Sequence, residues 1–427
     1  MKLFQHITDE TEHYETYKVF GLNLMEKATI HYRRAALTNK PIKNIYKRYI
    51  GSIIYITKLY NQCGLYKREI RLFSIPIIGT ERLNGHKFYQ ILGINIFARP
   101  QEFLRDFEEE CKIVIGKKYD DVYLLHRHIG DAYSCLIFIH EIIKRNNSKR
   151  PAIMVFSEQF QDMVKMTCPN IPCVYIDSKK PFEKRLYTRF SKECFEFNGI
   201  RFFPLVNTWT LGTKLTQGFK KSHELSLHKF YAYSYCFDLD FEKCSIDRAS
   251  VLPDAEKSML DKCQENNFNI DKFVFLATET FSYELLKIDF WISLINKLSE
   301  KGYGVFVNSV ARSKEGRKFY KRPQLDSDLG ESANYQSFYL SLAEAFALAN
   351  RAKKIVAIRS GFSEILAQCD PEVYILYSGS DPAKLHSRFN DLTLTKYPCS
   401  NKEKLHEFIM TDISNEDCIK KIVEDVS

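Results

Sequence analysis

Several features that would place this chain in a familiar class of protein are missing from its 427 residues. No run of about 18 apolar residues occurs, so we expect no membrane-spanning helix. The first residues turn acidic at Asp9 and lack the apolar segment of a signal peptide, which favours a cytoplasmic location. Neither GxGxxG nor GxxxxGK(S/T) is present, which removes the main support for a dinucleotide-binding or P-loop protein. With only 17 Gly and 13 Pro, the chain is neither collagen-like nor of low complexity.

Metal-binding motifs are missing as well. Twelve cysteines are scattered without a CxxC pair, and the closest two, Cys168 and Cys173, have no second pair to complete a zinc site. We expect most of them to be buried thiols. A DxD pattern occurs at Asp238 and Asp240, but in an irregular stretch rather than at a strand end. No metal cofactor is therefore expected.

The charge is mildly basic. There are 62 Lys and Arg against 53 Asp and Glu, a formal net charge of +9, and much of the excess lies in the first third of the chain. A dedicated nucleic-acid binder would carry a denser basic stripe, so no nucleic-acid partner is expected. An anionic ligand or the negative inner leaflet of a membrane is enough to explain the excess. The hydrophobic fraction of 45% supplies more than one core.

Residues 1–98 differ from the rest of the chain in composition and pattern, and they predict a small N-terminal α/β appendage. Three fragments, which begin at Tyr17, Ile70 and Tyr89, share an alternating apolar pattern that is typical of short strands. The segment Ile42–Leu65 is expected to be an amphipathic helix, with Lys43, Lys47, Arg48 and Lys58 among its Tyr and Ile residues. This basic helix either packs on the body of the protein or contacts an anionic membrane surface.

From residue 99 onward, apolar strand-like runs alternate with helical patterns, which predicts parallel sheets covered by helices. We expect one Rossmann-like domain at 99–235 and a second at 236–427, with an irregular connection near 207–268. Two such α/β domains facing each other would place a ligand cleft at the carboxyl ends of their strands.

The first turn that could carry catalytic residues lies between a predicted strand and a predicted helix. Its sequence is His126-Arg127-His128-Ile129-Gly130-Asp131. Gly130 would permit a tight turn, and Asp131 would fall near the helix N-terminus. Asp131 is either a simple N-cap or a general base that takes a proton from an acceptor hydroxyl. His126, Arg127 and His128 would add positive charge beside an anionic substrate. The two His residues have no evident third ligand, so they do not predict a metal site.

The second turn, Arg359-Ser360-Gly361-Phe362-Ser363-Glu364, also lies between a strand and a helix. Backbone N–H groups at Ser360 and Gly361 would form an anion site at the helix N-terminus, and Arg359 would add a forked charge for a phosphate. Glu364 would either complete a capping box or contact hydroxyls of a donor sugar.

These two turns resemble those of GT-B glycosyltransferases, and most nearly the heptosyltransferase-like family 9 enzymes of bacterial capsule and lipopolysaccharide assembly. Asp131 matches the Asp of the family's early Gly-Asp turn, which acts there as catalytic base. Ser360, Gly361 and Leu366-Ala367 match its late motif, while Arg359 replaces an Asp and Glu364 a His. The strand-end segment with Thr278 and Glu279 is similar to the family's phosphate-proximal loop.

The resemblance, which covers about residues 119 to 400, implies an inverting, metal-independent transfer of a sugar from a nucleotide-activated donor to a saccharide or lipid-linked acceptor. Asp131 would be the catalytic base, and the acceptor cleft would hold His126, Arg127, His128 and Gly130. The donor phosphate would lie near Arg359, Ser360, Gly361, Ser363, Glu364, Thr278 and Glu279. The nucleotide sugar would be a co-substrate, without a cofactor, and the enzyme would be cytoplasmic or peripheral on an anionic inner membrane.

Two other functions remain open from the sequence. A nucleotide-sugar epimerase or hydrolase of the same fold would need further acid–base groups, for which His223, Glu224 and His228 are candidates. A non-catalytic two-lobed sugar- or nucleotide-binding protein would bind a ligand without transfer.

Overall fold

The computed structural model describes residues 4–9, 14–19, 22–31, 43–50, 53–61, 64–73, 75–83, 86–100, 116, 118–125, 129–176, 194–197, 199–205, 217–218, 229–280, 283–308 and 334–424. Contacts divide the chain into two compact units, one made of residues 1–124 and 176–216, the other of residues 125–175 and 217–427. These units do not follow the boundaries expected after residues 98 and 235, and the three-domain organisation stays a prediction.

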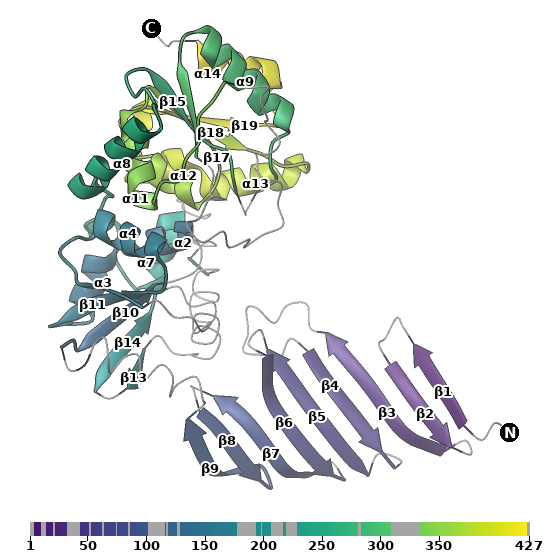
Figure 1. Ribbon diagram of the computed structural model, residues 1–427. Coiled ribbons are helices and arrows are strands. Elements are labelled where there is room, and N and C mark those ends of the chain that lie inside the picture. Colours follow the sequence, from purple (N-terminus) through teal and green to yellow (C-terminus); the bar gives the residue numbers. More distant parts are fainter. Residues whose placement is uncertain are drawn as a thin grey trace. The chain divides into compact units, whose positions relative to one another are not determined.

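The first hundred residues form a nine-stranded antiparallel sheet in which β1 to β9 lie side by side in chain order (Figure 1). Its strands are β1 (Phe4–Asp9), β2 (Tyr14–Val19), β3 (Leu22–His31), β4 (Lys43–Tyr49), β5 (Ile54–Asn61), β6 (Gly64–Leu72), β7 (Ile75–Leu83), β8 (His86–Ile91) and β9 (Ile94–Pro100). Three turns at one end of the sheet place Ile50, Phe73 and Leu92 at positive φ. Such left-handed residues are typical of the tight hairpin turns that match the twist of a sheet.

The prediction of a basic amphipathic helix at Ile42–Leu65 is wrong, because this segment contains the strands β4 and β5, which pair as a hairpin. Its Ile, Tyr and Thr residues favour extended backbone, and their alternation with polar residues has the period of a strand. In its described residues the appendage is therefore a β-sheet rather than α/β. The sequence also predicts a helix from Gln101 to about Val114, and these residues lie outside the described part of the chain.

The second sheet has five strands in the order β12-β11-β10-β14-β13. The pairs β11–β12 and β10–β14 are parallel, and the short β13 runs antiparallel to β14. The strands are β10 (Asp121–Leu125), β11 (Pro151–Val155), β12 (Cys173–Tyr175), β13 (Phe195–Phe197) and β14 (Ile200–Pro204). The helices α2 (Ile129–Leu136), α3 (Ile139–Arg145) and α4 (Glu158–Thr167) follow β10 and β11 in the chain.

The third sheet is wholly parallel, with the strand order β16-β15-β17-β18-β19. Its strands are β15 (Phe273–Ala277), β16 (Gly304–Asn308), β17 (Lys354–Ile358), β18 (Glu372–Tyr377) and β19 (Leu405–Ile409). Its helical segments are α8 (Pro253–Glu265), α9 (Ile288–Glu300), α11 (Leu342–Arg351), α12 (Gly361–Leu366), α13 (Pro382–Leu392), α14 (Asn415–Val423) and the short 3-10 turns Leu394–Lys396 and Lys402–Lys404. Every residue of β15 and β17 is buried, as expected for parallel strands covered on both faces.

The predicted α/β fold with two Rossmann-like units is confirmed by these two sheets and their helices. The strand β19 is not among the strands predicted from the sequence, and it pairs in parallel with β18 at one edge of the third sheet. The prediction of buried thiols holds for most of the described cysteines. Over the described residues, no helix is both long and apolar enough to cross a membrane.

Candidate active site

Asp131 is the third residue of α2 rather than the residue that precedes the helix. Its Oδ1 accepts a hydrogen bond from Tyr233 Oη at 2.7 Å, and Lys229 Nζ lies 3.5 Å from the same oxygen. The Asp131 side chain is 35% exposed, whereas Lys229 is 7% exposed. The Asp131 carboxylate is therefore accessible to solvent on one side and contacts Tyr233 and the buried Lys229 on the other. Of the residues expected beside it, His126, Arg127 and His128 lie outside the described residues.

Lys229 and Tyr233 both come from α7 (Lys229–Cys236), four residues apart and so on one face of the helix. Burial, and then the negative charge of Asp131, raise the pKa of Tyr233 well above its ordinary value. The phenol therefore remains protonated at neutral pH and donates its hydrogen to Asp131. A donor of this kind favours the ionised form of the carboxylate.

Glu364 lies on the other side of Lys229. The Lys229 ammonium donates to both carboxylate oxygens of Glu364, at 2.9 and 3.2 Å, and Ser134 Oγ lies 3.4 Å from Glu364 Oε2. Glu364 is almost fully buried. One ammonium thus lies between a buried carboxylate and an accessible one.

Arg359 completes this charge network from the end of β17. Its Nη2 donates to Glu364 Oε1 at 2.8 Å and to Tyr397 Oη at 3.0 Å. Its other N–H groups donate to the carbonyls of Ser360 and Leu392, and the side chain is only 3% exposed. Burial opposes the charge, but the neighbouring Tyr397 and Glu364 raise the pKa of Arg359 well above its ordinary value. The guanidinium faces protein groups and does not present the open fork expected for a phosphate.

Two serines cap α12, the helix that carries Glu364. Ser360 is the N-cap, its Oγ accepts from the backbone nitrogen of Ser363, and Ser363 Oγ accepts from the backbone nitrogen of Ser360. The reciprocal partner in the capping box is therefore Ser363, not Glu364. Contact of Glu364 with donor hydroxyls stays a prediction. Its carboxylate accepts hydrogen bonds from Lys229 and Arg359.

Gly130 and Gly361 are required by close packing rather than by turn conformation. Neither has a positive φ. A Cβ on Gly130 would lie 2.9 Å from Glu364 Oε1 and 3.0 Å from Gly361 Cα, and one on Gly361 would overlap the backbone nitrogen of Gly130. The first turns of α2 and α12 are therefore in direct contact, and this contact brings Asp131 near Glu364. The reason expected for Gly130, a tight turn, is corrected accordingly.

Thr278 and Glu279 follow β15 at the carboxyl edge of the third sheet. Thr278 is buried and its Oγ1 has no hydrogen-bond partner among the described residues, while Glu279 is half-buried. Thr280 Oγ1 donates to the carbonyl of Arg359 at 2.8 Å and so ties this loop to the end of β17. Thr278 is the residue of this loop with an unused polar group.

Two residues of the cluster, Lys229 and Tyr233, were missed because the stretch around them has no clear periodicity. The available signal was a lone lysine at the start of the aromatic run Lys-Phe-Tyr-Ala-Tyr-Ser-Tyr-Cys. A cation in such a run needs a buried partner, although the sequence does not say which.

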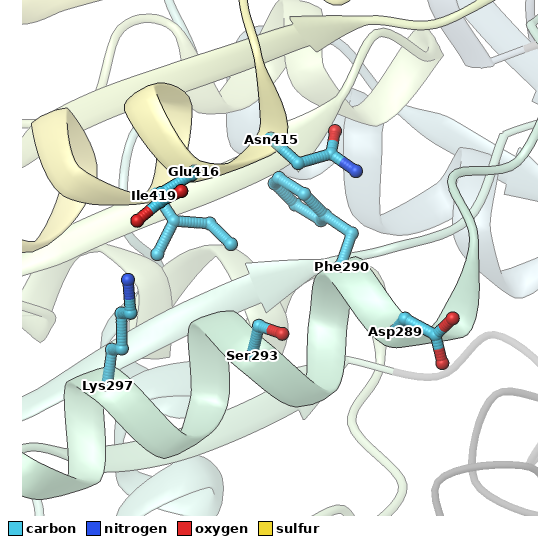
Figure 2. A pocket seen from close by; sticks show the side chains of 7 residues that line it. All are labelled: Asp289, Phe290, Ser293, Lys297, Asn415, Glu416 and Ile419. Carbon is cyan, nitrogen blue, oxygen red and sulfur yellow. The ribbon is translucent and has the colours of Figure 1, made fainter.

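Two further features of the described residues concern metal binding and cavities. In the described part of the chain, no group of three or more His, Cys, Asp or Glu could hold a metal ion. Asp238 and Asp240 are paired with Arg145 and Lys243. A cavity of about 300 Å³ lies between α9 and α14, where Figure 2 shows the residues that line it, Asp289, Phe290, Ser293, Lys297, Asn415, Glu416 and Ile419.

No protein-family model and no curated protein matches this sequence. Solved structures do: a glycosyl transferase family 9 protein from Veillonella parvula has 10% identity and a TM-score of 0.42, over 73% of this chain and 92% of that one. The Escherichia coli ADP-heptose lipopolysaccharide heptosyltransferase II has 11% identity and a TM-score of 0.40, over 71% and 98%. The heptosyltransferase WaaC of the same organism, with ADP, has 12% identity and a TM-score of 0.39, over 72% and 99%.

With identities of 10 to 12%, the chemistry of this chain must come from its own side chains.

Proposed function

We propose that this chain is a glycosyltransferase that moves a sugar from a nucleotide-activated donor to a hydroxyl of a saccharide or lipid-linked acceptor, with Asp131 as the general base. The observation that carries the proposal is the state of Asp131. Its carboxylate is accessible, yet one oxygen is fixed by the Tyr233 hydroxyl and the Lys229 ammonium. A base must be ionised and positioned before the substrate arrives, and these contacts supply both conditions.

In the proposed step, Asp131 takes the proton of the acceptor hydroxyl as its oxygen attacks the anomeric carbon. The bond from that carbon to the donor phosphate breaks, and the leaving nucleotide keeps the electron pair. Attack from the face opposite the leaving group inverts the configuration. The step requires no metal ion to accept the proton.

The charges of the cluster suit this step. Asp131 and Glu364 balance Lys229 and Arg359 before reaction. When Asp131 becomes protonated, the cluster is left with one net positive charge at the moment when the leaving phosphate gains negative charge. Fixed charge of this kind stabilises a transition state without reorganisation of solvent.

Arg359 acts in this proposal by holding Glu364, since its own donors are used within the protein. We place the donor phosphate instead near Thr278, whose buried hydroxyl has no partner. Ser360 and Ser363 shape the adjoining helix start through their capping box.

The test begins with thermal unfolding of the full chain in the presence of ADP-, GDP-, UDP- and dTDP-sugars, ADP-heptose among them. A bound donor stabilises by mass action, so one class should raise the melting temperature. Transfer from that donor is then measured for Asp131→Asn, which should be inactive with nearly unchanged donor affinity. The matched control is Asp238→Asn, an exposed carboxylate in another turn, which should retain transfer. Turnover by Asp131→Asn, or silence across the whole panel, would refute the proposal.

A further inference from the structure

The N-terminal sheet has two faces of opposite character. In the register, Ile56, Ile70, Ile78, Ile91 and Ile94 are directly opposite one another on successive strands from β5 to β9. Opposed residues of antiparallel strands share a face, so these five side chains form one continuous row. We call this side of the sheet the isoleucine face.

Much of the isoleucine face is open to solvent. Ile70, Ile78, Ile91 and Ile94 are exposed, the last by 65%, and Leu72, Ile75 and Phe97 extend the apolar surface along the same face. The turns after β4, β6 and β8 add Ile50, Ile53, Phe73 and Leu92, of which Phe73 is 67% exposed. Apart from Leu285, all exposed large apolar side chains of the described residues belong to this sheet. Soluble proteins leave a patch of this kind open mainly where it binds a partner or a membrane.

The same face is basic and carries no carboxylate from β3 to β9. Lys47 is opposite Ile56, and Lys58 is opposite Arg68 one step farther along these strands. The three carboxylates of β3 to β9, Glu26, Glu69 and Glu81, are all on the other face. There Glu26 pairs with Arg48, Glu69 with Lys67 and Arg71, and Glu81 with Lys67. The charges of the opposite face are thus neutralised within the sheet. On the isoleucine face Lys27 pairs with Glu15 of β2, whereas Lys47, Lys58 and Arg68 form no ion pair with another described residue.

We propose that the isoleucine face and its turns dock the protein on an anionic lipid surface. The apolar side chains would enter the interface between headgroups and acyl chains, while Lys47, Lys58 and Arg68 would lie against the phosphates. A second copy of the chain is a poorer occupant. Two isoleucine faces would bring Lys47, Lys58 and Arg68 of each copy together, and the one carboxylate of that face in β2 to β9, Glu15, already pairs with Lys27. A lipid surface supplies both the apolar layer and the negative charge. This inference concerns a surface that is separate from the Asp131 cluster, and it does not depend on glycosyl transfer.

The test is co-sedimentation of the full chain with vesicles of phosphatidylcholine alone or mixed with phosphatidylglycerol. We expect binding to the mixed vesicles, weakened by salt. Lys47→Gln and Lys58→Gln should each lower the partition coefficient about fivefold. The controls Lys144→Gln and Lys243→Gln, which alter lysines 81% and 83% exposed outside the sheet, should leave it unchanged.

The apolar contribution is tested by Ile78→Thr and Ile94→Thr, which keep the β-branched shape and so the strand. Each should weaken vesicle binding about tenfold, and Leu285→Thr should not. Circular dichroism of the variants checks that the sheet remains folded. If the isoleucine variants bind the vesicles as strongly as the parent protein, the proposal is overturned. So would a dimer in vesicle-free solution that the isoleucine variants dissociate, because that result would assign the face to a second copy.

Discussion

Lys229 and Glu364 form a buried ion pair, with Nζ 2.9 Å from Oε1, between two segments that are 135 residues apart in the chain. Glu364 also receives a hydrogen bond from Arg359, so this one carboxylate compensates two buried cations. A pair of this kind contributes less to stability than its distance suggests, because both ions were desolvated to form it. Its removal from one side only is nevertheless costly.

We therefore expect Glu364→Gln to destabilise the protein by about 3–5 kcal/mol, since it leaves Lys229 and Arg359 without their common anion. Urea unfolding of the full chain gives the difference. The matched control is Glu256→Gln, which breaks an exposed pair with Arg351 and should change stability by less than about 1 kcal/mol. Equal midpoints for the two variants would contradict the burial-based account of Glu364.

The contact between the first turns of α2 and α12 predicts that neither glycine tolerates a methyl group. Gly361→Ala places a Cβ onto the backbone of Gly130 and should cost about 1–3 kcal/mol. Gly379→Ala is the control, because its Cβ would meet only Leu385 at 3.6 Å. That variant should be neutral or slightly stabilising. A Gly361→Ala protein as stable as the parent would show that the two helix starts are not held together.

Tyr233→Phe removes the hydroxyl that donates to Asp131 and leaves the ring in place. The hydrogen bond favours the ionised carboxylate, so its loss should move the acid limb of the kcat/KM profile to higher pH, with a lower rate at neutral pH. The pKa of Tyr233 lies well above its ordinary value, so titration of this phenol does not produce an alkaline limb near neutrality. A change in rate without any movement of the acid limb would assign Tyr233 a role other than tuning Asp131. Tyr231→Phe, on the same helix, serves as the control.

The parts of this molecule that the sequence predicts are those with local causes. Buried apolar runs such as Phe273–Ala277 and Lys354–Ile358 are short, bounded by turns and separated by helical patterns, and they are strands in the structure. The helix prediction for Ile42–Leu65 was wrong because its Tyr and Ile residues fit both the helical and the strand period over a short window. Only pairing with neighbouring strands decides between the two. Asp131 and Glu364 could be singled out from their turns. Their connection through Lys229 could not, because it depends on a contact between distant segments.

Arg359 provides the sharpest contrast between the role expected from the sequence and the surroundings found. An arginine that binds a phosphate can be replaced by lysine with loss of affinity, whereas an arginine that satisfies several buried acceptors cannot be replaced without loss of stability. Arg359 donates to the carbonyls of Leu392 and Ser360, to Glu364 and to Tyr397. A lysine ammonium cannot reach all of these acceptors in one position.

We expect Arg359→Lys to destabilise the chain by about 2–4 kcal/mol. The dissociation constant of the nucleotide that stabilises the parent should meanwhile be nearly unchanged, when measured well below the melting temperature of the variant. The opposite result, a stable variant with weakened nucleotide affinity, would restore Arg359 to the phosphate site and require the guanidinium to leave Glu364 when the donor binds.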